Sequence, residues 1–342
     1  MPIQRVQQAI EDIKQGKMVV MIDDEDRENE GDLVYAATFS TPEKVNFMAS
    51  EAKGLICVSI SKEIADRLNL QPMVQHNDSQ HETAFTVSVD ARDATTGISA
   101  FERDMTIKLL ANPISSPEDL VRPGHIFPLV AKEGGVLVRT GHTEGSVDLC
   151  KLAGLSPAAV ICEIMREDGQ MARRDDLEAF SRKHGLNIVY ISDIVEYRLR
   201  NERLVHLKRE ETIEFFDTKV TKKTFIDHEE KEHYAIIFYK IHETENIRFH
   251  NIGRDVDLLL SQSRYDQLIH SIDYLKHNGG IIVFLDTEGA LAGDEMKEYG
   301  IGAQILAELG VKNIRLLVSN KGKEFVGLGG FGLNIIEEIE LA

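Results

Sequence analysis

The chain has 342 residues, more than a single hydrophobic core usually serves, so we expect two domains. Acidic residues outnumber basic ones, 57 to 39, and the formal net charge is −18. Nucleic acids and anionic membranes would be repelled by such a chain, so we expect neither as a partner. This composition fits an enzyme that acts on a small molecule.

The first residues and the cysteines indicate the cellular compartment in which the protein is expected. The segment MPIQRVQQAIEDIK carries charges where a signal peptide would be apolar, and no apolar run approaches the ~20 residues that span a bilayer. We therefore expect a cytoplasmic protein. The three cysteines, Cys57, Cys150 and Cys162, show no CxxC spacing. This pattern predicts neither a disulfide framework nor a cysteine-based metal site.

Apolar periodicity predicts helices and strands along the first half. Apolar residues from Val6 to Ile13 recur at helical spacing, and MVVMI (18–22) is typical of a buried strand. Thr41 and Pro42 are the expected cap and first residue of a helix. Apolar, β-branched runs predict further strands at residues 55–60, 84–89, 135–139, 159–164 and 186–191.

Helices frame the predicted domain boundary. One should run from Asp175 to a stop at Gly185, and a charged helix from Ser192 to about Arg203 precedes the boundary. The two domains are then residues 1–204 and 205–342. In the second, strands are expected at 235–241, 280–285 and 314–318, with helices at 264–277 and before Gly310. Because strands and helices alternate in both halves, the expected fold class is α+β, or mixed α/β.

A dense acidic segment, DDEDRENEGD (23–32), follows the first predicted strand with seven carboxylates and one arginine. A charge run of this kind is most often a solvated loop. Its place directly after a buried strand, and the tight backbone that Gly31 permits, favour a binding site instead. Carboxylate oxygens suit Mg²⁺ or Mn²⁺, and a cation would offset their mutual repulsion. A divalent-metal site is therefore a candidate here.

Two segments, RPGHIFPL (122–129) and RTGHTEGSVDL (139–149), place a histidine after a glycine in what we expect to be loops. A single loop histidine is more often a structural hydrogen-bonding group. Here an arginine stands three residues before each histidine. The stretch from Arg139 to Thr143 offers guanidinium, hydroxyl and backbone donors to a phosphate, and His142 could also bind the metal.

Two further features complete the pattern. ARDATTGIS (91–99) is a polar turn with two threonine hydroxyls, and Glu163 is a carboxylate within an apolar strand. Glu163 is either a paired structural residue or an acid/base group. Together the segments predict a metal-dependent enzyme with a phosphorylated polar substrate, although their spacing does not name the reaction.

Five segments in order, DDEDRENEGDLV, ARDATTGISA, RPGHIFPL, RTGHTEGSVDL and CEI, carry a family resemblance. They resemble the signature segments of 3,4-dihydroxy-2-butanone 4-phosphate synthase, over residues 1 to about 200. The resemblance implies conversion of D-ribulose 5-phosphate to L-3,4-dihydroxy-2-butanone 4-phosphate and formate, in riboflavin biosynthesis. It also implies Mg²⁺ or Mn²⁺, two ions per site, and a homodimer with sites at the subunit interface.

The resemblance assigns roles to single residues. Glu28 resembles the ligand shared by both metal ions, and His142 resembles the histidine ligand; both would also touch the substrate. His125 and Glu163 resemble the residues needed for catalysis. Glu30 and Cys57 also match the family but have no assigned role. The remaining matching positions are the expected substrate contacts: Arg27, Asp32, Asp93, Thr96, Arg139, Thr140, Gly141 and Thr143.

These residue types suit the implied reaction. Forming an enediol from a ketose requires a base to remove the C3 proton, and a divalent cation stabilises negative charge on adjacent oxygens. Loss of water, skeletal migration and release of formate then require groups that exchange protons near neutrality, roles that we assign to His125 and Glu163.

From about residue 205 the chain resembles GTP cyclohydrolase II, most clearly at residues 299–323 and 327–333. That family binds zinc through three cysteines, whereas no cysteine follows Cys162 here. SQSRYDQ (261–267) replaces its CDCG run, and Glu295 and Lys297 stand where it has a catalytic aspartate and arginine. We expect no zinc in this domain and no cyclohydrolase activity. Structural support is the expected role, with regulation and nucleotide binding as alternatives.

Three other interpretations stay open. The chain could be a bifunctional enzyme that retains cyclohydrolase activity, a non-catalytic scaffold, or an unrelated metal-dependent sugar-phosphate aldolase or isomerase. The missing cysteines oppose the first and the intact motifs of the first half oppose the second. Formate among the products would exclude the third.

Overall fold

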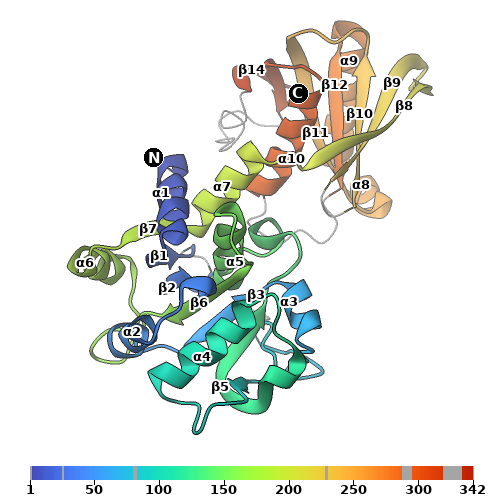
Figure 1. The fold of residues 1–342 in the computed structure, drawn as a ribbon. Helices are drawn as coiled ribbons and strands as arrows, with labels where there is room; N and C mark the ends of the chain where they lie inside the picture. The colour runs from blue at the N-terminus through green and yellow to red at the C-terminus, as the bar shows by residue number, and fades with distance from the viewer. Residues whose placement is uncertain are drawn as a thin grey trace. The chain divides into compact units, whose positions relative to one another are not determined.

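The computed structural model describes residues 2–24, 27–79, 83–227, 230–286, 295–318 and 333–341. They form two compact units, Met1–Tyr197 and Arg198–Ala342, and the chain passes from one to the other within helix α7 (Ile191–Asn201) (Figure 1). Each unit contains a seven-stranded mixed sheet with helices packed on it. The predicted α+β class is therefore confirmed.

The sheet of the first unit has the order β4-β5-β3-β6-β2-β1-β7. Its strands are β1 (Val19–Ile22), β2 (Gly31–Ala36), β3 (Cys57–Ile60), β4 (Val89–Ala91), β5 (Leu120–Val130), β6 (Ala158–Glu163) and β7 (Asn187–Tyr190). β3 is parallel to β5 and β1 is parallel to β7, while the other neighbours are antiparallel. Strands that are distant in sequence therefore lie next to each other in the sheet.

Helices cover both faces of this sheet, so its central strands are buried along their length and are apolar throughout. On one face α5 (His142–Leu152) packs on β1, β2, β3 and β6, beside α1 (Pro2–Lys14). On the other face lie α4 (Ala100–Ala111) and α2 (Pro42–Phe47) (Figure 1). The remaining short elements of this unit are α3 (Lys62–Arg67), α6 (Arg174–His184), η1 (Ala37–Phe39), η2 (Met48–Ala52), η3 (Pro117–Asp119) and η4 (Gly135–Leu137).

Local signals set several boundaries as predicted. The Thr41 side chain accepts a hydrogen bond from the Lys44 backbone N–H, and Pro42 opens α2, where its missing N–H costs nothing. Gly185 ends α6 in the left-handed region with a φ of 63°, a conformation that suits glycine. These predicted boundaries are confirmed.

Three predicted elements are wrong. The strand expected at 84–89 is shortened to β4, with only isolated bridges before it. Residues 135–139 form a 3₁₀ turn and not a strand, since Gly134 and Gly135 adopt positive φ angles of 86° and 64°. RPGHIFPL is not a loop but part of β5, whose proline at 123 lies near a register shift in the β4 pairing, where a missing N–H is tolerated.

The second unit has the strand order β14-β13-β11-β12-β10-β9-β8. Its strands are β8 (Val205–Phe215), β9 (Thr218–Asp227), β10 (Glu232–Phe238), β11 (Thr244–Ile252), β12 (Gly280–Asp286), β13 (Asn313–Val318) and β14 (Asn334–Glu340). β11 to β14 pair in parallel and β8 to β10 pair antiparallel. The helices are α8 (Asp255–Leu260), α9 (Gln262–Asn278) and α10 (Glu295–Glu308).

Helix α9 packs on β11 and β12, where Ile272 and Leu275 join a core cluster with Ile236 and Ile282. The predicted strand at 280–285 and the predicted helix at 264–277 are confirmed. Among the described residues of the whole chain, no helix has the length and apolar character that a membrane crossing requires.

Candidate functional site

The register of the first sheet brings several predicted site residues together at neighbouring strand ends. The acidic loop, residues 23–30, joins the end of β1 to the start of β2. Asp32 on β2 pairs directly with Glu163 at the end of β6. Cys57 starts β3, between β6 and β5, and lies opposite Phe127 of β5. Residues more than a hundred positions apart in the sequence are therefore neighbours.

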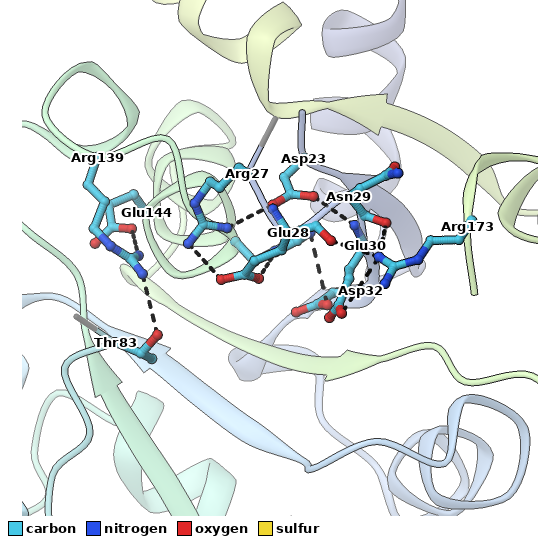
Figure 2. A network of polar contacts seen from close by, with 11 residues as sticks. Asp23, Arg27, Glu28, Asn29, Glu30, Asp32, Thr83, Arg139, Glu144 and Arg173 are labelled. Carbon is cyan, nitrogen blue, oxygen red and sulfur yellow. Dashed lines mark hydrogen bonds and ion pairs between the residues drawn. The ribbon is translucent and has the colours of Figure 1, made fainter. Parts of the chain in front are cut away.

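Asp23 organises the acidic loop from within. Its carboxylate is buried and accepts hydrogen bonds from the backbone N–H groups of Glu28 (3.2 Å) and Glu30 (2.8 Å). Arg27 pairs with the same carboxylate at 2.8 Å and with Glu28 Oε1 at 2.9 Å, and Figure 2 shows its guanidinium between the two. The described residues of this loop, 23–24 and 27–30, are therefore held by specific contacts and are not a solvated run.

Arg173 holds this loop from the other side (Figure 2). It precedes α6, and its Nη1 donates to the backbone carbonyls of Glu28, at 2.7 Å, and Asn29. Asn29 has a φ of 55°, in the left-handed region, so its carbonyl is fixed in an uncommon orientation. Sequence reasoning missed Arg173, because nothing in MARRDD separates it from an ordinary surface arginine.

Three side chains of metal-ligand type converge beside the loop. Asp23, Glu28 and His142 each offer one ligand atom, and these atoms lie within 4.8 Å of one another. His142 Nδ1 is 3.8 Å from Glu28, and His142 Nε2 is 4.0 Å from Asp32. His142 is 6% exposed, and in the part of the chain that the structure describes Nε2 has no hydrogen-bond partner. An unpartnered buried nitrogen is costly, so this donor set fits a divalent cation.

The same neighbours shift the proton equilibria. Burial opposes the charged form of His142, but the carboxylates of Asp32 and Glu28 outweigh it and raise the histidine pKa to about 9. Burial raises the pKa of Asp32, which His142 opposes and Glu163 reinforces. Burial and the nearby Glu28 likewise raise the pKa of Glu30. The raised pKa values show that these side chains tend to keep protons when no cation offsets their negative charge.

The N-terminus of α5 borders this cluster. His142 is its first residue and not part of a loop as predicted, with Thr143 next and Gly141 as the cap. A Cβ at Gly141 would overlap the Arg139 guanidinium, so a larger residue there would displace the arginine from its place beside Glu144. The first backbone N–H groups of a helix lack intrahelical acceptors and attract anions. Thr140, half-buried, completes the stretch.

Arg139 is oriented by two polar partners, of which Glu144 is buried. Its Nη1 is 2.5 Å from Glu144 Oε2, and its Nη2 is 3.4 Å from the Thr83 hydroxyl (Figure 2). The other Glu144 oxygen accepts the Lys132 backbone N–H. A guanidinium fixed in this way beside a helix N-terminus suits a phosphate group.

His125 lies on β5, where Asp90 at the neighbouring β4 contacts it twice. Asp90 accepts the His125 backbone N–H at 2.8 Å and lies 2.8 Å from the ring Nδ1. Asp90 is buried and was missed by sequence reasoning. The available signal was its position at the end of an apolar run, directly before the turn 91–99.

Of the remaining predicted residues, Glu163 and Cys57 lie in the sheet, and Asp93 and Thr96 lie in a turn. Glu163 Oε2 accepts a hydrogen bond from the Leu55 backbone N–H at 2.8 Å. Burial raises the pKa of the Cys57 thiol well above its usual value, so Cys57 stays a thiol. Asp93 and Thr96 are exposed in the turn before α4. Within the acidic run, Glu25 and Asp26 lie outside the described residues.

In the second unit, residues 261–267 form the start of α9. A cavity of about 220 Å³ lies beside them, lined among others by His250, Arg264 and Phe284. The side chains of Glu295 and Lys297 lie outside those that the structure describes, as do residues 319–323 and 327–332.

Comparison with known sequences matches both halves of the chain. The 3,4-dihydroxy-2-butanone 4-phosphate synthase family matches residues 7–197, and the GTP cyclohydrolase II family matches residues 290–340. A 3,4-dihydroxy-2-butanone 4-phosphate synthase of Wolinella succinogenes is 58% identical over 100% of this chain and 98% of its own length. A riboflavin biosynthesis protein of Bacillus subtilis is 41% identical over 98% of this chain and 93% of its own.

Two solved structures are similar as well. A two-domain 3,4-dihydroxy-2-butanone 4-phosphate synthase from A. baumannii covers 98% of this chain and 99% of its own, with a TM-score of 0.83 and 38% identity. A 3,4-dihydroxy-2-butanone 4-phosphate synthase in complex with two magnesium ions covers 57% of this chain and 97% of its own, with a TM-score of 0.56 and 42% identity. The likeness therefore spans the whole chain.

Arg173→Ala tests the support of the acidic loop. The change removes the hydrogen bonds to the carbonyls of Glu28 and Asn29, so we expect Mg²⁺ affinity to fall by about 10- to 100-fold, as for other groups that orient metal ligands. Isothermal titration calorimetry measures the affinity. The control is Arg182→Ala, an exposed arginine of α6. Equal affinities for the wild type and Arg173→Ala would show that the loop keeps its shape without this arginine.

Proposed function

Because this chain belongs to the 3,4-dihydroxy-2-butanone 4-phosphate synthase family, we propose that its first unit is a lyase that converts D-ribulose 5-phosphate to L-3,4-dihydroxy-2-butanone 4-phosphate and formate. The convergence of Asp23, Glu28 and His142 beside Asp32 and Glu163, which lie opposite each other on β2 and β6, carries this proposal. Metal ligands and proton-transfer groups share one edge of the sheet, as an enolisation chemistry requires.

Glu28 and His142 would hold the cation, Mg²⁺ or Mn²⁺, and we propose two ions per site. A solved relative is in complex with two magnesium ions, which supports this number. Bound there, the metal supplies Lewis-acid stabilisation of negative charge on adjacent sugar oxygens. Asp23 already accepts three hydrogen bonds, so its part is to orient the loop that presents Glu28.

Substrate binding would divide between two sides of the cluster. Arg139 and the first turn of α5, with Thr140, Gly141 and Thr143, suit the phosphate, because the guanidinium is preset by Glu144 and the first amides of a helix lack intrahelical acceptors. Arg27 and Asp32 would bind sugar hydroxyls from the loop and the strand. Asp93 and Thr96 would contact the substrate from the turn before α4.

Glu163 and His125 would exchange protons with the substrate. Glu163 Oε2 is anchored by the Leu55 N–H, which leaves the carboxylate fixed in direction at the sheet edge. His125 presents a side chain that is 44% exposed. Ile98, in the turn before α4, and the α4 residue Phe101 are 54% and 71% exposed. Exposed apolar side chains in this part of the unit support a homodimer with its sites at the interface. We further propose that the enzyme works in the cytoplasm.

Formate production from D-ribulose 5-phosphate tests the function. The wild type should release formate with Mg²⁺ and none with EDTA, and Glu28→Gln should lose at least about 100-fold in kcat because a neutral amide replaces an anionic ligand. The control is Glu178→Gln, which changes an exposed carboxylate of α6. Well-folded wild-type protein that makes no formate with Mg²⁺ or Mn²⁺ would refute the proposal and favour a non-catalytic role.

Proton release on metal binding tests the assignment of His142. Burial lowers the pKa of His142, but the carboxylates of Asp32 and Glu28 outweigh it and raise the pKa to about 9. The ring is therefore protonated at neutral pH before a cation binds. A cation needs the unprotonated nitrogen, so Mg²⁺ affinity should rise with pH until the pH passes about 9. Calorimetry in two buffers of different ionisation enthalpy should count about one released proton. His142→Gln should abolish the release and His184→Gln should keep it; identical heats in both buffers would contradict the assignment.

We also propose that the second unit has no GTP cyclohydrolase II activity and holds no zinc. No cysteine follows Cys162, so the three thiolate ligands of that family cannot form. Its proposed role is structural support of the chain.

The activity of the second unit is checked with GTP. Full-length protein incubated with GTP and Zn²⁺ should leave the nucleotide intact in chromatography, while the same sample makes formate from D-ribulose 5-phosphate. GTP consumption that a zinc chelator stops would instead establish a bifunctional enzyme with a different metal arrangement.

A further inference from the structure

The cavity of about 220 Å³ in the second unit lies at the carboxyl ends of two neighbouring parallel strands. His250 near the end of β11 and Phe284 near the end of β12 are paired in register, and their ring centroids are 5.4 Å apart. Helix α9 adds Arg264 and Leu268, which share one helix face because they are four positions apart. In open α/β sheets, ligands bind outside the carboxyl ends of the parallel strands. The cavity therefore lies where a sheet of this kind binds ligands.

The lining of this cavity includes an arginine that is available to a ligand. Arg254 is paired with Asp257, with 2.9 Å between Nε and Oδ2, so their charges offset each other. Arg264 makes neither a hydrogen bond nor an ion pair with any residue that the structure describes. Asp255, the other carboxylate of the lining, is exposed at the start of α8. The Arg264 guanidinium can therefore receive an anion without first leaving a carboxylate.

His250 supplies a neutral donor beside this cation. Burial, and then the neighbouring guanidinium groups of Arg248 and Arg264, lower the pKa of His250 to about 4. The ring is thus uncharged at neutral pH and keeps one N–H donor. Among the described residues, this ring contacts Phe284 but makes no hydrogen bond. An anion would find a ring N–H, a guanidinium and a positive potential in one place.

The size and walls of the cavity limit its ligand. Phe284, Leu268 and Leu258 give it apolar surface, and its volume of about 220 Å³ is below the roughly 300–1,000 Å³ of most ligand pockets. A nucleoside triphosphate needs more room, whereas a phosphate group on a single sugar or a short carbon chain fits. Arginine suits phosphate because its planar donors match the phosphate oxygens.

The sequence of this region supplies positive charge without a metal. Arg264 belongs to SQSRYDQ (261–267), the segment that stands where the GTP cyclohydrolase II family has its CDCG run. A guanidinium stays charged at physiological pH and has no acceptor with which to bind a metal. The charge that a bound cation would bring is therefore carried by the chain itself.

We propose that this cavity binds a phosphate monoester of a small sugar or polyol without a metal ion, and that Arg264 and the ring N–H of His250 hold the phosphate. The organic part lies against Phe284 and Leu268. This site differs from the candidate lyase site in its unit, its residues and its chemistry. The inference therefore goes beyond the proposed function and stands whether or not the first unit makes formate.

NMR signals of the His250 ring test the site in the full-length protein, because they report on this cavity even if the first unit binds the same probe. The probe is D-ribose 5-phosphate at neutral pH, with EDTA present. We expect saturable shifts of the His250 signals, which are assigned with His250→Gln. Arg264→Gln should weaken the Kd read from these shifts by about 10-fold or more, because a hydrogen bond between charged groups is lost.

Two variants serve as matched controls. Arg254→Gln changes an arginine of the same cavity that is already paired with Asp257, so it should weaken the Kd much less than Arg264→Gln. Arg139→Gln alters the expected phosphate contact of the first unit and should leave the His250 response unchanged. An equal Kd in the wild type and Arg264→Gln, or loss of the His250 response in Arg139→Gln, would overturn the inference.

Inorganic phosphate and GTP separate the possible ligands. A higher Kd for inorganic phosphate than for D-ribose 5-phosphate supports a site for the ester, and an equal Kd overturns it in favour of the free ion. Tighter binding of GTP, or binding that requires added Zn²⁺, contradicts a compact site without a metal. His250 signals that none of the three probes shifts would refute the site altogether.

Discussion

The buried carboxylate of Asp23 is the interaction on which the candidate site depends. Burying an ion costs several kcal/mol unless its oxygens are satisfied. Here two backbone N–H groups and the Arg27 guanidinium satisfy them, and hydrogen bonds to a charged group contribute about 1.5–3 kcal/mol each. The carboxylate thus fixes the backbone of Glu28 and Glu30 beside the end of β1, within a segment whose charges otherwise repel one another.

The site still holds an excess of negative charge. Around Glu28, the carboxylates of Asp23, Glu30 and Asp32 face two arginines, Arg27 and Arg173, and one buried histidine. Burial is the main cause of the raised pKa of Asp32, and neighbouring carboxylates add to it; at His142 the carboxylates of Asp32 and Glu28 outweigh burial and raise the pKa. Natural sequences break the rules of stability mainly where function requires it. A divalent cation would relieve this imbalance, which is why we place the metal here.

Sequence patterns predicted what local chemistry determines. The cap at Thr41, the stop at Gly185 and the buried strand β1 depend on residues within a few positions, so the sequence alone sufficed. The partners that orient the site were missed because they act at long range: Asp90 lies 35 positions from His125, and Arg173 lies 145 positions from Glu28. Only the family resemblance linked the five segments, and it named the metal and catalytic positions without their supporting residues.

The second unit shows that a fold and its chemistry depend on different residues. Its core joins Val220, Ile236 and Phe238 of the sheet to residues of α9, and none of these is a metal ligand type. A buried polar pair also persists: His233 Nε2 lies 3.2 Å from Asp227, and its Nδ1 accepts the Asp286 N–H, so both ring nitrogens are satisfied within the fold. His125 differs in that, among the described residues, only its Nδ1 makes a ring hydrogen bond, and its side chain is 44% exposed. Since packing stabilises the sheet and a few polar side chains confer reactivity, a domain can lose its thiolates and keep its architecture.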